Sequence, residues 1–262
     1  MVPPVAPDKA CGVTPQRACI NPEAHVRAKP ILLLTRPHAQ SLEFADMCRR
    51  RLGAGIAVMI SPLLEIQHRS GIAPIDPNAA LVFTSVHGVA ALGAAQPRGR
   101  RAYCVGARTA QAATAQGYTA VSAGGDGAAL VQLLVTERPL GPIWHARGDH
   151  VGTDIVAELA GQGLQAQSLV AYEQLAQPLT AQAEAALIAA RPIVAPVFSA
   201  RSARLLGQAV QNAAAPLWLA AISAGAAQAY GGPAPARLAI AQNPDAAAML
   251  DLVATFWTQA AA

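Results

Sequence analysis

The chain contains few lysines, cysteines and aromatic residues, and each shortage excludes classes of protein. Only Lys9 and Lys29 are lysines, so none is available in the rest of the chain for a phosphate-binding loop. The four cysteines show neither metal-ligand spacing nor a disulfide framework, and the apolar patterns around Cys48 and Cys104 predict that both are buried. Aromatic residues make up 4% of the chain and hydrophobic residues 53%, which predicts a core of aliphatic and small side chains.

Charge and long apolar runs are also scarce. The net charge is +4, and residues 1–30 carry +2 of it, which leaves 4 − 2 = +2 for the remainder. So diffuse a positive charge does not predict nucleic-acid binding. No apolar run reaches the length of a membrane span, and the proline-rich residues 1–29 do not form a signal peptide. We therefore expect a cytoplasmic protein without a membrane segment, preceded by a disordered leader at 1–29.

The rest of the chain contains one pattern written twice. Val-Phe-Thr-Ser at 82–85 reappears as Val-Phe-Ser-Ala at 197–200, an offset of 197 − 82 = 115. Asp-Gly-Ala-Ala-Leu at 126–130 reappears as Asp-Ala-Ala-Ala-Met at 245–249, an offset of 245 − 126 = 119. Solenoid repeats have periods of roughly 20–50 residues, so this pattern indicates a duplicated domain. The repeats alone divide the chain near residue 141, into two similar lobes with a cleft between them.

Buried strands alternate with amphipathic helices in both halves. The apolar run at 31–34 is typical of a strand buried on both faces, and Leu42, Ala45 and Cys48 follow at helical spacing. This alternation predicts an α/β protein with two similar doubly wound parallel-sheet lobes of the flavodoxin-like kind.

The loops that follow the predicted strands carry hydroxyl groups, arginines and glycines. Ligands of parallel sheets bind beyond the carboxyl ends of the strands, where helix N-termini attract anions. The same residues are also good helix caps, and either role explains any single loop. Their recurrence in both lobes favours a ligand with several negative charges. The candidate binding residues in these loops are Arg36, Thr84, Ser85, His87, Thr109, Arg147, Ser199 and Ser223.

No standard catalytic or cofactor motif is present. The chain has no phosphate loop, dinucleotide fingerprint, zinc-protease motif or Cys-x-x-Cys pair. His145 and His150 flank Arg147 but lack a third partner, so they do not predict a metal site. We therefore expect no metal and no cofactor. Such a site suits a substrate that is already reactive, which the protein has to fold and shield from water.

The chain resembles the uroporphyrinogen-III synthase family over roughly residues 31–257. The stretches that carry the resemblance are short and follow one another in the family's order. They are Leu-Leu-Thr-Arg-Pro (33–37), Ser-Pro-Leu-Leu-Glu-Ile (61–66), Leu-Val-Phe-Thr-Ser-Val-His-Gly-Val (81–89), Val-Gly-Ala-Arg-Thr-Ala (105–110), Gly-Asp-Gly-Ala-Ala-Leu (125–130), His-Ala-Arg-Gly-Asp (145–149) and Val-Ala-Tyr-Glu (170–173).

This resemblance implies a discontinuous division of the chain. Two α/β lobes would be joined by a two-stranded β-ladder, with the cleft between the lobes. The expected parts are residues 30–60 and 175–262 as lobe 1, residues 67–167 as lobe 2, and residues 61–66 and 168–174 as the linker strands. This division and the one near residue 141 agree if the two repeats exchange their first strand and helix.

The resemblance also implies an activity and its residues. Family members convert linear hydroxymethylbilane, which carries eight carboxylates, into uroporphyrinogen III, with inversion of ring D and loss of water. They use no cofactor or metal, and we expect a monomer. Tyr172 matches the tyrosine proposed to assist loss of the hydroxyl group; the alternative is that it packs at the ladder with its hydroxyl satisfied. Thr109 matches a threonine that faces the cleft. Arg36, Thr84, Ser85, Arg147 and Ser199 match positions that line the cleft.

Two positions depart from the family pattern. His87 stands where an asparagine is common, and Ala226 stands where a threonine is frequent, so any role of that threonine hydroxyl is lost. Both departures favour binding of the substrate through backbone N–H groups. The alternative function is a non-catalytic two-lobed binder of a polyanionic small molecule. The isomer formed from hydroxymethylbilane would distinguish the two.

Overall fold

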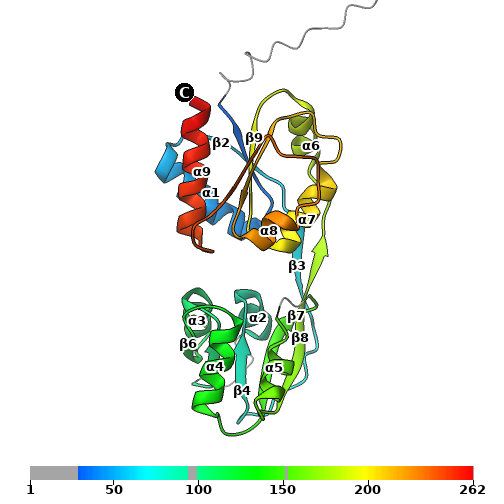
Figure 1. Ribbon diagram of the computed structural model, residues 1–262. Coiled ribbons are helices and arrows are strands. Elements are labelled where there is room, and N and C mark those ends of the chain that lie inside the picture. Colours follow the sequence, from blue (N-terminus) through cyan, green and yellow to red (C-terminus); the bar gives the residue numbers. More distant parts are fainter. Residues whose placement is uncertain (1–28, 94–98, 151–152, 262) are drawn as a thin grey trace, which may run out of the picture.

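The computed structural model describes residues 29–93, 99–150 and 153–261, so all of the expected leader except Lys29 lies outside the described residues. Helices and strands alternate along the chain, and the strands form two separate sheets. Figure 1 shows each sheet with its own helices, one body above the other, and extended chain running between them. The α/β class with parallel sheets, predicted from the sequence, is confirmed.

The first sheet has five strands that all run parallel, in the order β11-β10-β9-β1-β2. These strands are β1 (Ile31–Leu34), β2 (Ala57–Ile60), β9 (Ile193–Val197), β10 (Leu217–Ala221) and β11 (Arg237–Ile240). The three central strands are almost completely buried, as their continuous apolar runs predict. The edge strand β11 alternates between half-buried and exposed residues, because only one of its faces is covered.

Helices cover both faces of this sheet. On one face, α1 (His38–Leu52) and α9 (Ala246–Ala261) contribute Phe44, Cys48 and Val253 to an apolar cluster. On the other face lie α6 (Ala181–Ile188), α7 (Ala200–Ala209) and α8 (Ala224–Gln228). Helix α1 ends at Leu52 and is followed by the C-cap residue Gly53, whose φ of 98° favours glycine.

The second sheet has six strands in the order β3-β8-β7-β4-β5-β6. They are β3 (Leu64–His68), β4 (Ala80–Phe83), β5 (Arg101–Cys104), β6 (Thr119–Ser122), β7 (Ile143–Gly148) and β8 (Ala166–Ala176). Helices α2 (Val86–Leu92) and α3 (Ala107–Ala115) cover one face, and α4 (Gly127–Glu137) and α5 (Ile155–Gly161) cover the other. Cys48 and Cys104 are both fully buried, as predicted.

The two sheets share one strand order. Counting β1, β2, β9, β10 and β11 as strands 1 to 5, the first sheet reads 2-1-3-4-5, the order of flavodoxin-like sheets. The parallel part of the second sheet reads the same way if the count starts at β7 and β8 and continues with β4, β5 and β6. Strand β1 pairs with β9, so a division into two contiguous units near residue 141 is wrong. The internal repeats could not reveal this exchange, because they record similarity and not pairing.

Strands β3 and β8 differ from the others because they pair antiparallel. Residues 64–68 of β3 face residues 172–176 of β8, while the first half of β8 pairs parallel with β7. Figure 1 shows these two strands running from one body toward the other. Among the described residues, no helix is long and apolar enough to cross a membrane.

Candidate functional site

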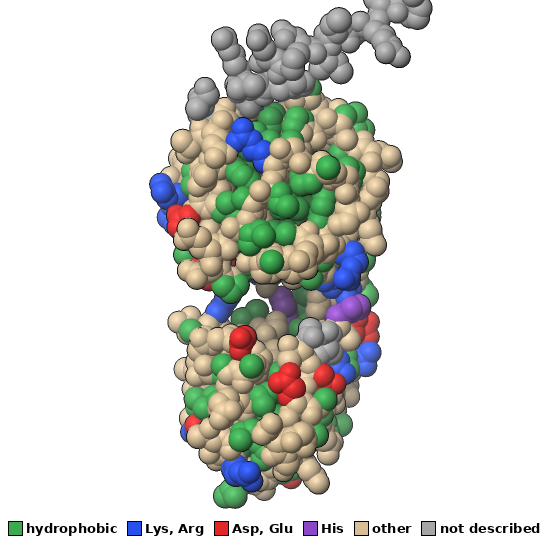
Figure 2. Space-filling model, in the orientation of Figure 1, with side chains coloured by type: hydrophobic (Ala, Val, Ile, Leu, Met, Phe, Trp, Pro, Cys, Tyr) green, Lys and Arg blue, Asp and Glu red, His purple; other side chains and the backbone are tan. Residues whose placement is uncertain are grey.

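The candidate site lies where the carboxyl ends of the two sheets face each other. In the 2-1-3-4-5 order, ligands bind between strands 1 and 3, which here are β1 and β9 in the first sheet and β7 and β4 in the second. The segments at the ends of these four strands carry five of the residues predicted from sequence. They are Arg36 after β1, Thr84 and Ser85 after β4, Arg147 at the end of β7 and Ser199 after β9. Figure 2 shows an open hollow between the two bodies.

Tyr172 is held against the end of β7. Its side chain is only 5% exposed, and a Cβ atom placed on Gly148 would lie 2.8 Å from Cε2 of the tyrosine ring. Only glycine at position 148 therefore allows the ring to take this place. Burial raises the pKa of Tyr172, and a hydrogen bond with the Ser85 side chain acts in the opposite direction. The phenol is therefore protonated at neutral pH and can donate a hydrogen bond.

His87 contacts both the Tyr172 ring and helix α1 of the first body. The two ring centroids are 5.7 Å apart. Ser85 caps α2 by accepting a hydrogen bond from the His87 backbone N–H, which fixes the first turn of that helix. The His87 Nε2 atom lies 2.8 Å from Nε2 of Gln40, which belongs to α1 of the first body. Burial, with smaller contributions from His68, Arg108 and Arg36, lowers the pKa of His87 from 6.5 to about 4.

Arg36 supplies a positive charge beside the first sheet. Its guanidinium carbon lies 4.1 Å from the centroid of the Phe198 ring, a cation–π contact just after β9. Burial and the charge of Arg108 lower the pKa of Arg36 to about 10, and the Glu43 carboxylate partly offsets them. Arg36 is therefore still charged at neutral pH and can pair with a carboxylate. Arg108 of α3 forms an ion pair with Glu43 of α1, a second contact between the bodies.

A small cavity opens next to Tyr172 on the α4 and α5 side of the second sheet. Its volume is about 240 Å³. The residues that line it are Thr84, Val105, Gly127, His145, Arg147, Gly148, His150, Thr153, Ile155 and Tyr172. Thr84 and Arg147 were predicted from sequence to line the site, whereas His145 was considered as a metal ligand, rejected for that role and interpreted as a strand residue. Among the described residues, no three His, Cys, Asp or Glu side chains gather in a way that could hold a metal ion.

The remaining predicted residues have local roles in the helix ends. Ser199 forms a capping box with Ser202 at the start of α7, and Ser223 accepts a hydrogen bond from the Ala226 N–H at the start of α8. The helix-cap interpretation therefore holds for both serines. Their role in binding a ligand stays a prediction. Thr109 is 5% exposed in the first turn of α3, so its hydroxyl is largely covered.

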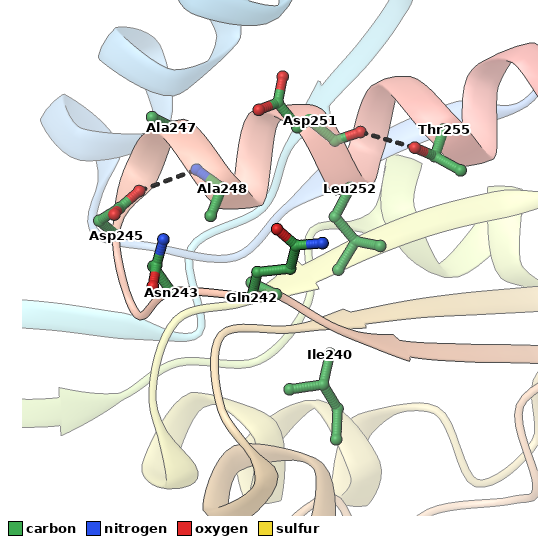
Figure 3. A pocket seen from close by; sticks show the side chains of 10 residues that line it. Ile240, Gln242, Asn243, Asp245, Ala247, Ala248, Asp251, Leu252 and Thr255 are labelled. Carbon is green, nitrogen blue, oxygen red and sulfur yellow. Dashed lines mark hydrogen bonds between the residues drawn. The ribbon is translucent and has the colours of Figure 1, made fainter.

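A larger pocket lies at the same carboxyl edge of the first sheet but at its β11 side, where β11 leads into α9 (Figure 3). Its volume is about 530 Å³. Figure 3 shows two carboxylates in its wall, from Asp245, which bonds to the Ala248 N–H, and from Asp251. No arginine lines it, so the pocket does not suit an anionic ligand. Strand β10 also separates β11 from the β1–β9 pair.

Sequence reasoning missed Gln40, Glu43 and His145. The first two lie on α1, and their partners are 47 and 65 residues away in the chain. No motif in the sequence marks them, because the contact depends on how the two bodies face each other. His145 was visible as a histidine within an apolar run, but its burial and its hydrogen bond to Thr84 were not.

Comparison with known proteins gives one family. Residues 47–251 match the model of the family described as uroporphyrinogen-III synthase HemD, which is well over half of the chain. The solved uroporphyrinogen-III synthetase of Helicobacter pylori has a similar fold, with a TM-score of 0.61 and 16% identity over 87% of this chain and 99% of that one. A mutant uroporphyrinogen III synthase of Thermus thermophilus aligns over 88% of this chain and 99% of that chain, with 16% identity and a TM-score of 0.49. No curated protein matches the sequence.

Proposed function

The chain belongs to the uroporphyrinogen-III synthase HemD family, whose members cyclise hydroxymethylbilane to uroporphyrinogen III. We propose that this chain catalyses the same reaction, in the cleft next to Tyr172. The enzyme is a lyase, because the reaction releases the terminal hydroxyl group of the substrate as water. The alternative of a non-catalytic binder is not favoured, since the family match extends over both sheets.

The observation that carries the proposed site is the setting of Tyr172. A hydroxyl group leaves as water only if it receives a proton, and a hydrogen-bond donor positioned next to it can supply that proton. The buried phenol has its pKa raised, so it keeps its proton at neutral pH. Its ring contacts both Gly148 and His87, and its hydroxyl forms a hydrogen bond with the Ser85 side chain. We assign Tyr172 as the catalytic group that donates to the departing hydroxyl.

The positive charges around the cleft suit the carboxylates of the substrate. Arg36 and Arg147 would form charge-assisted hydrogen bonds, which are roughly twice as strong as neutral ones. Thr84, Ser85, His87, Thr109, Ser199 and Ser223 are proposed as further binding positions. Ser85, Ser199 and Ser223 already cap helices, so we assign the binding there to the free N–H groups of those helix ends.

Enclosure of the substrate would control which product forms. Released hydroxymethylbilane cyclises without the enzyme to the isomer in which ring D is not inverted. If the two bodies close on the linear tetrapyrrole, they would exclude water and hold ring D in the orientation that leads to the inverted product. Two contacts between the bodies, of Gln40 with His87 and of Glu43 with Arg108, would hold the closed form together.

The domain division goes with this function. We propose residues 30–60 and 175–262 as lobe 1, residues 67–167 as lobe 2, and residues 61–66 and 168–174, which include parts of β3 and β8, as the linker strands that form the hinge. The protein would act as a monomer in the cytoplasm, with no nucleic-acid partner. Light scattering at assay concentration tests the monomer, and a dimer would overturn it.

The decisive test is the isomer made by the purified protein. Hydroxymethylbilane is supplied with no added metal or cofactor, and the oxidised porphyrins are separated by chromatography. We expect isomer III as the main product. Formation of isomer I alone, at the spontaneous rate, would refute the activity in this chain, and substrate binding without turnover would support the alternative binder.

A further inference from the structure

His145 is a buried histidine, and only one of its two ring nitrogens has a hydrogen-bond partner among the described residues. It is 2% exposed and lies on β7. Its Nε2 atom is 3.0 Å from the hydroxyl oxygen of Thr84. Its Nδ1 atom is buried and has no hydrogen-bond partner among the described residues. The residue lines the 240 Å³ cavity beside Tyr172, together with Thr84 and Arg147.

The surroundings keep the His145 ring neutral. Burial, with a smaller contribution from the charge of Arg147, lowers its pKa to about 4. A neutral imidazole carries one N–H, on either Nδ1 or Nε2. A proton on Nδ1 would make that nitrogen a buried donor without an acceptor. A proton on Nε2 instead leaves Nδ1 with only an unused lone pair. Unpaired buried donors are rarer and costlier than acceptors with an unused lone pair.

The proton on Nε2 determines what the Thr84 hydroxyl can do. Nε2 then donates to the Thr84 oxygen, so the hydroxyl hydrogen of Thr84 is not used in this pair. With the opposite tautomer, Thr84 would donate to the ring and present only lone pairs, which repel an anion. Thr84 follows β4 directly and lines the same cavity, so its free hydrogen is available to a ligand there.

We propose that His145 is a positioning residue, which turns the Thr84 hydroxyl into a donor toward the cavity, and that the cavity takes one carboxylate-bearing arm of the tetrapyrrole. Arg147 supplies the positive charge in the same wall. The inference rests on the proposed function for the identity of the ligand. The direction of the Thr84–His145 hydrogen bond does not depend on it.

A purely structural role fits this histidine poorly. Its neighbours on the same side of the sheet, Val82, Ile143 and Ile155, are buried and apolar. An aliphatic side chain would pack there without leaving a ring nitrogen unpaired. What histidine adds is a hydrogen bond to Thr84, and an apolar residue at 145 would leave the Thr84 hydroxyl without an assigned direction.

Four variants separate this role from packing. Thr84→Val removes the hydroxyl and keeps the shape, and His145→Leu removes the ring donor. We expect each to raise the KM for hydroxymethylbilane about tenfold to a hundredfold, the effect of losing one hydrogen bond to a charged group, with kcat changed less than twofold. The double variant should be no worse than either single one, because each single substitution already removes the Thr84 hydroxyl oriented toward the cavity. His145→Gln places an amide N–H near the position of Nε2 and should stay within about twofold of the parent.

A measurement without substrate tests the hydrogen-bond direction even if His145→Leu does not fold. In protein labelled with ¹⁵N-histidine, the imidazole shifts of His145 should be those of a neutral ring protonated at Nε2. A proton on Nδ1, additive effects in the double variant, or a Gln variant as impaired as Leu would each overturn the proposal. If the parent protein formed no isomer III, the proposed function would fail instead, and the imidazole spectrum would still decide the tautomer.

Discussion

The amide nitrogen of Gln40 lies 2.8 Å from the ring nitrogen Nε2 of His87, so a side chain of the first body bonds to one of the second. An amide nitrogen can only donate, which makes Nε2 the acceptor and the ring neutral. The same ring contacts Tyr172. Closure of the cleft and the position of the proposed catalytic phenol are therefore linked through a single histidine.

Removing the contacts across the cleft should favour the open form. In the double variant Gln40→Ala with Glu43→Ala, the closed form loses one partly buried hydrogen bond and one exposed ion pair. Together these contribute roughly 1–2 kcal/mol. The radius of gyration from small-angle X-ray scattering should increase, while the melting temperature changes little. Gln182→Ala, at an exposed position of α6, is the matched control. An unchanged radius of gyration would show that these contacts do not hold the bodies together.

Tyr172→Phe should lower turnover roughly tenfold to a hundredfold, the low end for loss of one proton donor. The ring remains, so the packing against Gly148 and the fold should be intact. Tyr230→Phe is the control, because the Tyr230 hydroxyl is also buried, in the first body, and has no partner among the described residues. That variant should keep full activity. Equal turnover of Tyr172→Phe and the parent would leave Tyr172 with a packing role only.

Gly148→Ala should reproduce the effect of losing Tyr172. The new methyl group would lie 2.8 Å from the tyrosine ring, so the ring has to move. Overpacking of this kind costs about 1–3 kcal/mol of stability. Gly161→Ala has no atom within 4 Å of its added methyl and should be neutral or slightly stabilising. Isomer assays and thermal unfolding of both variants check this, and a fully active Gly148→Ala enzyme would show that the ring position is not critical.

The sequence identified the parts of the molecule that depend on local patterns. Alternating apolar runs predicted the parallel α/β sheets, and the strand-end loops predicted Arg36, Thr84 and Arg147 near the cleft. Helix α6 was missed, because its apolar positions are mostly alanine and give little periodic signal. Thr180, which caps it, was the available sign of its start.

What the sequence could not supply depends on contacts between distant segments. The pairing of β1 with β9 joins residues more than 160 positions apart, and only the family resemblance, not the residue patterns, implied that these two segments share a lobe. The Thr84–His145 hydrogen bond and the Gln40–His87 contact arise only after the sheets and bodies are in place. Neither residue type nor spacing distinguishes these pairs from other polar residues of the chain.

The two buried histidines should make stability fall in mild acid. His87 and His145 both have their pKa lowered from 6.5 to about 4 by burial. Between these values the unfolded chain binds protons at the two rings that the folded chain does not bind. The contribution of these two rings to the free energy of unfolding should therefore be constant above about pH 6.5. It should decrease as the pH falls from 6.5 to 4.

Comparison of variants isolates each ring in this pH dependence. Urea unfolding is measured at several pH values for the parent, for His145→Gln and for His87→Asn. Each substitution should reduce the number of protons taken up on unfolding by about one over this range, because one shifted group is removed. Asp149 and Glu137, whose pKa values are lowered, contribute with the same sign at more acid pH and are unchanged by either substitution. If both variants kept the slope of the parent, the rings would have to be protonated in the folded protein. The acceptor role of His87 toward Gln40 and the neutral His145 ring would then both be wrong.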